Sequence, residues 1–139
     1  MPYTRDMALN PLTFGSMNTA PYSNEVHCAG EVWCTAIWDA LWDMIDLYGF
    51  DPDIRASGTG GNNMMLQLVV DGMKLQPCRP TMIDARDAII LADEANNDGA
   101  NVCLLWTAFA RRGFGVGAKA KSGIVGKYTE DFAAPSECL

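Results

Sequence analysis

His27 is the only histidine among the 139 residues, and it lies at the start of a long apolar stretch that runs from Val26 to Tyr48. Histidine is the side chain whose charge and hydrogen bonding change near neutral pH. With no second histidine, the chain does not contain the usual three-ligand catalytic zinc site of histidines and a carboxylate. We therefore expect His27 to contribute one group to a larger active site. From the residue pattern alone, a histidine at a helix start that only hydrogen-bonds a neighbour is the more frequent case.

Two acidic patterns could bind a metal, and each has a simpler interpretation. Glu31 follows His27 by four residues, a helical spacing that can share a metal, but one histidine and one glutamate do not make a site alone. Asp39, Asp43 and Asp46 fall on one side of a helix, where they could hold calcium. A solvated polar face is far more common, and we expect one here.

Two glycine patterns resemble nucleotide-binding motifs, and neither is complete. The glycines at 58, 60 and 61 are not followed by Gly-Lys-Ser/Thr, which excludes a phosphate loop. The glycines at 113, 115 and 117 follow an expected helix instead of a strand, which excludes a dinucleotide fingerprint. We expect both groups to serve the backbone only.

The cysteines allow two interpretations. None of the five belongs to a C-x-x-C pair, so a structural zinc site is not expected. Cys28 and Cys34 are six residues apart and would point to different sides of one helix, so they cannot bridge each other. Cys78 and Cys103 lie near the starts of two expected helices, and antiparallel helices could bring them together as a disulfide. Five buried thiols in a cytosolic protein are the alternative, and the sequence leaves both open.

The residues expected to position His27 form a long helix from about 25 to 48, preceded by an irregular lead-in over 1–24. Apolar residues recur in it at three- and four-residue spacing, Ser23 or Asn24 can cap its start, and Gly49 can end it. Trp38 and Trp42 widen its apolar surface, which indicates a central helix.

Three further helices are predicted after the polar loop 51–61. Asn62 or Asn63 can cap the second, whose expected buried side is Met65, Leu66, Val69, Val70 and Met73. Thr81 and Asp84 form an acidic capping box that opens the third, which runs to about Asn96. The fourth has a core side of Val102, Leu105, Trp106 and Phe109 and stops at Gly113. With an irregular tail over 118–139, we predict an all-α helical bundle with four main helices and a single domain over 1–139.

Charge and hydropathy exclude two classes of partner. Acidic residues outnumber basic ones by 17 to 10, and this net charge of −7 would repel nucleic acid. Half of the basic residues fall late in the chain without interleaved aromatics, and we interpret them as a solvated end: Arg111, Arg112, Lys119, Lys121 and Lys127. The chain contains no charge-free apolar run of about 18 residues, so no membrane-spanning segment is expected.

Seven ordered stretches resemble the fungalysin family of secreted zinc metalloendopeptidases, best known from fungi. They cover nearly the whole chain and match the C-terminal helical part of that family: Asn10-Pro-Leu-Thr-Phe, Asn24-Glu-Val-His-Cys-Ala-Gly-Glu-Val-Trp, Gly60-Gly-Asn-Asn, Leu75-Gln-Pro-Cys-Arg-Pro-Thr, Asp84-Ala-Arg-Asp-Ala, Ala108-Phe-Ala-Arg-Arg-Gly and the ending Glu130-Asp-Phe-Ala-Ala-Pro-Ser-Glu-Cys. The resemblance implies an extracellular endopeptidase that hydrolyses internal peptide bonds of protein or peptide substrates.

The resemblance also implies which parts of the site this chain holds. The family's H-E-x-x-H segment and its later zinc-ligating Glu are not in these residues, so zinc would be bound by an upstream lobe of the same protein and the chain alone would be inactive. Val26-His27 resembles the V-H of thermolysin-like peptidases, which assigns His27 a hydrogen bond to the substrate carbonyl oxygen as it becomes an oxyanion. No cofactor or metal ligand is expected in this chain. The upstream lobe and, in the precursor, a propeptide would be its partners.

Two questions stay open on the sequence. A helix start disfavours the protonated form of His27, whereas Glu25 or Glu31 would favour it, and the pattern does not decide between them. The aromatic-rich helix around Trp38 and Trp42 also fits an alternative, a non-catalytic helical module that binds another protein through an apolar patch.

Overall fold

The computed structural model describes residues 1–55, 58–120 and 127–139, and its described part is helical. The helices are α1 (Val26–Tyr48), α2 (Gly61–Leu75), α3 (Met82–Asn97) and α4 (Val102–Arg111). Two short 3-10 helices, η1 (Phe14–Asn18) and η2 (Ser136–Cys138), lie near the two ends. In the described residues, β-type pairing is limited to two isolated bridges, Phe114 with Asp131 and Lys119 with Thr129. The predicted all-α bundle of four main helices is confirmed.

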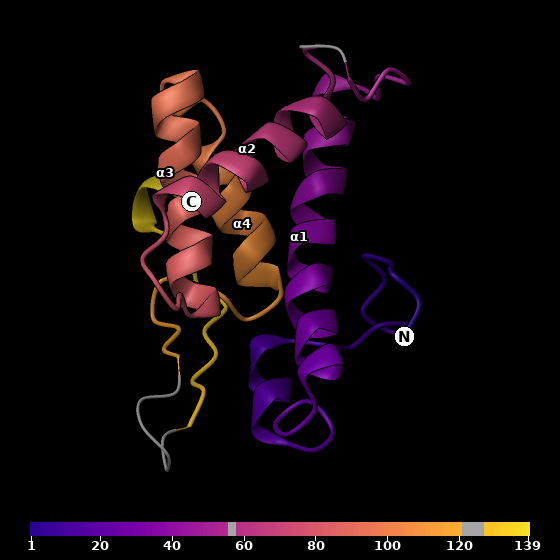
Figure 1. The fold of residues 1–139 in the computed structure, drawn as a ribbon, viewed down its shortest axis with the longest axis vertical. Helices are drawn as coiled ribbons and strands as arrows, with labels where there is room; N and C mark the ends of the chain where they lie inside the picture. The colour runs from indigo at the N-terminus through magenta and orange to yellow at the C-terminus, as the bar shows by residue number, and fades with distance from the viewer. Residues whose placement is uncertain (56–57, 121–126) are drawn as a thin grey trace.

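Helix α1 runs along the long axis of the molecule, and α2 and α4 pack against it (Figure 1). α2 contacts both α1 and α3, and α4 contacts α1 and α3. The core between them contains residues from all four helices: Ala36, Ala40, Met44, Met65, Leu68, Ile89, Ala92, Leu105 and Phe109. None of the helices in the described residues combines the length and apolarity that crossing a bilayer requires.

The helix starts follow local chemistry, and two of the expected caps are wrong. Thr81 and Asp84 do form the predicted capping box of α3. Glu25, not Ser23 or Asn24, caps α1, and its side chain accepts a hydrogen bond from the Cys28 N–H. α2 begins at Gly61 instead of after Asn62 or Asn63, and because a Cβ at Gly61 would clash with the backbone of Met44, glycine lets this end of α2 pack against α1.

Helix α2 also differs from its predicted burial. Met65 and Leu68 face the core, whereas Leu66, Val70 and Met73, which we expected to be buried, are exposed. The apolar residues of α2 therefore lie on two sides of the helix, and the three- and four-residue spacing did not identify which side faces the core.

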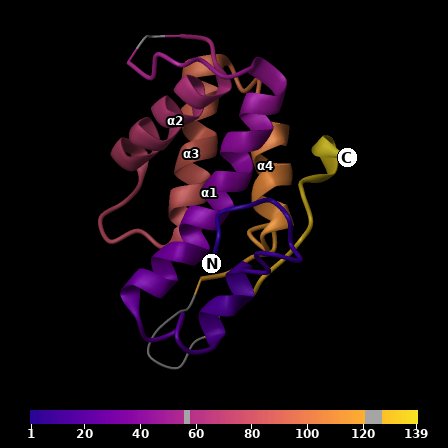
Figure 2. The ribbon, with the colours of Figure 1, turned by 90° about the vertical axis from the view of Figure 1, so that its right-hand side faces the viewer.

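The predicted pairing of Cys78 with Cys103 is wrong. Cys103 forms a disulfide with Cys138, 35 residues later, while Cys34 and Cys78 are exposed free thiols. The C-terminal residues run back alongside α4 (Figure 2), which brings the last cysteine to the start of that helix. The alternative of five buried thiols is wrong for the same reasons.

Candidate functional site

His27 occupies the first turn of α1 with its ring in solvent. The imidazole is 91% exposed, and its Nδ1 lies 2.7 Å from Glu25 Oε1. In the described part of the chain this is the only side-chain hydrogen bond of the ring. The backbone of a helix start is rigid, and the carboxylate fixes the ring's direction, so the Nε2 edge is presented to whatever approaches α1.

Glu25 holds two groups at the helix start at once. One carboxylate oxygen contacts His27 Nδ1, and the other accepts the Cys28 N–H at 2.8 Å. The hydrogen bond with His27, followed by that from Cys28, lowers the pKa of Glu25 from 4.5 to about 2. Because an ionised carboxylate only accepts hydrogen bonds, Nδ1 must carry a proton. Nε2 then donates a hydrogen bond only when the ring carries its second proton.

We expect the carboxyl of Glu25 to titrate near pH 2. Since its pKa is lower in the folded chain than the ordinary value, its contribution to stability is complete above about pH 4.5 and is lost as the pH falls toward 2. Carboxyl-detected NMR on the chain measures this directly, and His27→Ala should move the pKa of Glu25 back toward 4.5. A wild-type Glu25 that titrates near 4.5 would show that the Glu25–His27 contact does not form in solution.

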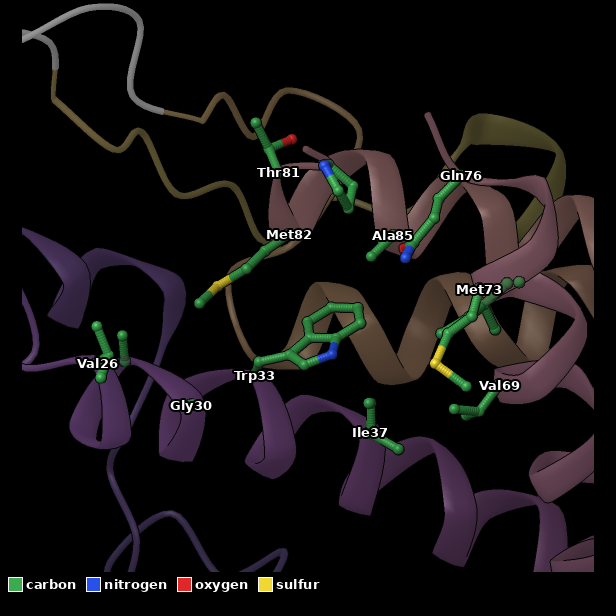
Figure 3. Close-up of a pocket in the computed structure, with 14 residues that line it drawn as sticks. Val26, Gly30, Trp33, Ile37, Val69, Met73, Gln76, Thr81, Met82 and Ala85 are labelled. Carbon is green, nitrogen blue, oxygen red and sulfur yellow. The ribbon is translucent and has the colours of Figure 1, made fainter. Parts of the chain in front are cut away.

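An apolar groove opens beside His27. It has a volume of about 390 Å³ and lies between α1, α2 and α3 (Figure 3). Val26 and Gly30, on either side of His27 in the sequence, line its end at the start of α1, and no charged side chain lines it. Sequence analysis missed this groove, because its walls come from three helices and the apolar pattern of each helix was interpreted as core. Gly30 in a helix interior was the available signal.

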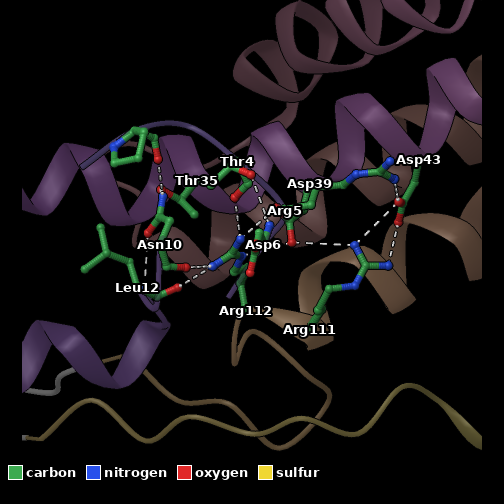
Figure 4. A network of polar contacts seen from close by, with 11 residues as sticks. Thr4, Arg5, Asp6, Asn10, Leu12, Thr35, Asp39, Asp43, Arg111 and Arg112 are labelled. Carbon is green, nitrogen blue, oxygen red and sulfur yellow. Dashed lines mark hydrogen bonds and ion pairs between the residues drawn. The ribbon is translucent and has the colours of Figure 1, made fainter. Parts of the chain in front are cut away.

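Of the three aspartates expected on a solvated face of α1, Asp46 is exposed, whereas the other two are paired and largely withdrawn from solvent. Asp39 is fully buried against Arg112, and Asp43 lies between Arg5 and Arg111 (Figure 4). The prediction of a wet face is therefore wrong at these two positions. Each aspartate is paired with an arginine that lies far away in the sequence.

Arg112 is also buried, which corrects its assignment to a solvated end. Its Nε and Nη2 donate to the two Asp39 oxygens at 2.9 and 3.1 Å. Nη1 donates to the carbonyls of Asn10 and Leu12, and Nη2 also donates to that of Thr4. All of its guanidinium hydrogens are used, and together they hold the segment before η1 against α1 and α4. Lys121, assigned to the same solvated end, lies outside the described residues.

The described residues do not fit a zinc ion. They contain no group of three His, Cys, Asp or Glu side chains placed to hold a metal. Glu31, which follows His27 at helical spacing, lies 3.8 Å from the amino-terminal nitrogen of Met1. The site therefore consists of an oriented imidazole and an adjoining apolar groove, and it is incomplete as a metal centre.

Comparisons with known proteins identify the family of the chain. The family model described as fungalysin metallopeptidase (M36) matches residues 1–118, a range that contains His27 and Glu25. The chain is 43% identical to the extracellular metalloproteinase MEP of Fusarium vanettenii, over 97% of this chain and 21% of that protein. It is 42% identical to the extracellular metalloproteinase 10 of Coccidioides posadasii, over 99% of this chain and 22% of that protein.

A third relative, the extracellular metalloproteinase MEP of Pyricularia oryzae, is 47% identical over 85% of this chain and 19% of that protein. The chain thus spans about a fifth of the length of the relatives it matches. The family match covers well over half of its residues, and the chain belongs to the fungalysin metallopeptidase family.

Proposed function

We propose that this chain is the C-terminal helical lobe of a secreted zinc metalloendopeptidase that hydrolyses internal peptide bonds of proteins, and that His27 stabilises the charge that develops on the substrate carbonyl oxygen. The observation that carries this proposal is the exposed imidazole at the start of α1, held through Nδ1 by Glu25. Support for secretion and proteolysis comes from the relatives, which are named extracellular metalloproteinases.

The chemistry follows from the geometry of the pair. When a nucleophile attacks an amide carbonyl, negative charge develops on the carbonyl oxygen, and a fixed hydrogen-bond donor lowers the barrier. With Nδ1–H directed at Glu25, the free donor is Nε2–H of the doubly protonated ring. Glu25 stabilises that positive charge and prevents the ring from rotating. His27 therefore acts as a preorganised, charge-assisted donor, and Glu25 is its positioning residue.

The other catalytic groups are assigned to another part of the same protein. Since the described residues do not fit a metal, zinc is held by an upstream lobe, and in the precursor a propeptide also contacts the assembled protease. The share of the relatives that lies outside the match, about four fifths of their length, supports such an arrangement.

The proposal is tested by activity with and without the missing part. The 139-residue chain alone should bind no stoichiometric zinc and should cleave no casein. A chimera in which the chain replaces the matched segment of the Fusarium vanettenii relative should cleave casein and lose that activity to a chelator. Chelator-sensitive cleavage by the chain alone would contradict the proposal, as would a folded chimera without activity.

A non-catalytic helical module that binds another protein is the second candidate. The exposed apolar residues of α2 and the partly exposed Trp42 on α1 favour it. Loss of cleavage in the folded chimera, together with tight binding of the chain to the upstream lobe, would favour this module over the protease.

A further inference from the structure

Helix α2 presents apolar side chains to solvent as well as to the core. Met65 and Leu68 are buried, and Leu66, Val70 and Met73 form an exposed row at four- and three-residue spacing, which we name the α2 stripe. A helix that is apolar on opposite sides is normally buried on both. The α2 stripe is therefore an apolar surface that the described part of the chain leaves uncovered.

The α2 stripe continues into the groove beside His27. Met73 belongs to both, and from it the groove extends between Trp33 and Ile37 of α1 and Met82 at the start of α3 (Figure 3). Its far end is lined by Val26 and Gly30. One continuous apolar surface thus joins the outer side of α2 to the first turn of α1.

Two glycines line the groove, and the packing of this chain accounts for one of them. A Cβ at Gly72 would lie 2.9 Å from Ile89 Cγ1, so Gly72 allows α2 and α3 to pack closely. A Cβ at Gly30 would meet no atom within 4 Å. Glycine in a helix interior is less stable than alanine, and no contact within the described residues requires it here. A second segment lying close across Gly30 would require it.

We propose that this surface, the groove together with the α2 stripe, is the seat of an uncharged apolar segment from the zinc-binding part of the same protease. The inference rests on the proposed function and identifies the surface through which its two parts join. The groove is lined by Val26 and Gly30, which lie one residue before and three residues after His27. A segment seated there lies beside the imidazole, so its docking brings the remaining catalytic groups up to the Nε2 edge.

Two observations favour this occupant over a second copy of the chain. The groove lining carries no charge that would attract a second copy, and two copies with a net charge of −7 each would repel one another. The Fusarium vanettenii relative has about four fifths of its length outside the matched region, which supplies a segment of the same polypeptide. A covalently linked segment also has a high effective concentration at the groove.

The test uses the chimera with the Fusarium vanettenii relative and two variants that face the surface. Gly30→Leu fills the groove and Val70→Asp places a carboxylate in the α2 stripe; Ala95→Leu, at an exposed position of α3, is the matched control. In the chimera both variants should lower the midpoint of thermal unfolding by about 8 °C or more and reduce activity at least about tenfold, as overpacking or a buried unpaired charge does. Ala95→Leu should change neither.

In the 139-residue chain neither variant should lower the midpoint of thermal unfolding, because Val70 is exposed there and leucine favours the helix at position 30 more than glycine does. Stability and activity in the chimera that match those of Ala95→Leu would overturn the proposal, since a segment seated in the groove leaves no room for the leucine. Concentration-dependent dimers of the chain that Val70→Asp dissociates would overturn it in favour of a second copy. His27→Ala in the chimera separates the two proposals: it tests catalysis and should leave the unfolding midpoint unchanged.

Discussion

Replacing Arg112 by alanine is expected to lower the free energy of unfolding by about 3–5 kcal/mol. Both partners of the Arg112–Asp39 pair are fully buried, so the substitution leaves the carboxylate of Asp39 without its bidentate partner in a place that water does not reach. A native domain is stable by only about 5–15 kcal/mol, so this loss is a large fraction of the total.

The loss has a second component in the N-terminal segment. Arg112 donates hydrogen bonds to the backbone carbonyls of Thr4, Asn10 and Leu12. These residues are far from α4 in the sequence, and the hydrogen bonds hold them near its end. Asn10 also reaches α1, where its Nδ2 lies 3.2 Å from Thr35 Oγ1. Without the guanidinium, we expect hydrogen exchange at residues 4–14 to accelerate before the rest of the chain unfolds.

Chemical denaturation of Arg112→Ala and of two companions measures this effect. Arg111→Ala removes a neighbouring guanidinium that is 36% exposed, pairs with Asp43 at 2.9 Å and approaches Asp39 only to 3.5 Å, so it should cost about 1 kcal/mol or less. Arg112→Lys keeps the positive charge but not the five donors, and it should be intermediate. A loss below about 1 kcal/mol in Arg112→Ala would show that the buried pair does not hold the segment.

The local signals in the sequence located the helices that position the site. The apolar spacing from Val26 to Tyr48 and the Thr81–Asp84 capping box depend on neighbours within one or two turns, and the structure has α1 and α3 where they predicted. Gly113 likewise follows the end of α4 with a positive φ of 81°. These features could be predicted because each depends on contacts within a few residues.

Features that depend on distant residues could not be predicted in the same way. The helical pattern assigns Asp39 to a polar, solvated face, because its buried partner Arg112 lies 73 positions later in the sequence. Cys103 pairs with Cys138 only because the C-terminal residues return along α4. Of the site, the exposed position of His27 follows from the helix start, but its hydrogen bond depends on the rotamer that Glu25 adopts as the helix cap.

Replacing His27 by alanine in the chimera is expected to lower kcat on casein about 10²–10³-fold with little change in KM. The reason is that the Nε2–H of the cationic ring would contact an oxygen whose charge appears only in the transition state. The imidazole is 91% exposed, and its only side-chain hydrogen bond within the described residues is to Glu25, so its removal should not unfold the chain. The midpoint of thermal unfolding of the variant is the control for folding.

Substitution of Glu25 tests the same role of His27 through its hydrogen-bond partner. Glu25→Gln keeps one acceptor oxygen, which can serve either His27 Nδ1–H or the Cys28 N–H but not both as the two carboxylate oxygens do, and it removes the negative charge beside the cationic ring. Its activity should fall, because the ring loses the charged partner that fixes its direction and assists its donor. Glu31→Gln, on the same helix, is the matched control and should leave activity unchanged, because the side-chain hydrogen bond of the ring in the described residues goes to Glu25.

The two variants together distinguish a catalytic imidazole from a structural one. If His27 served only to hold Glu25 at the start of α1, His27→Ala would change the unfolding midpoint and leave kcat within about threefold of the wild type. Loss of an oxyanion donor costs far more. A lowered kcat in His27→Ala at unchanged stability, combined with a loss of activity in Glu25→Gln but not in Glu31→Gln, indicates an imidazole that Glu25 holds in place and that touches the reacting carbonyl.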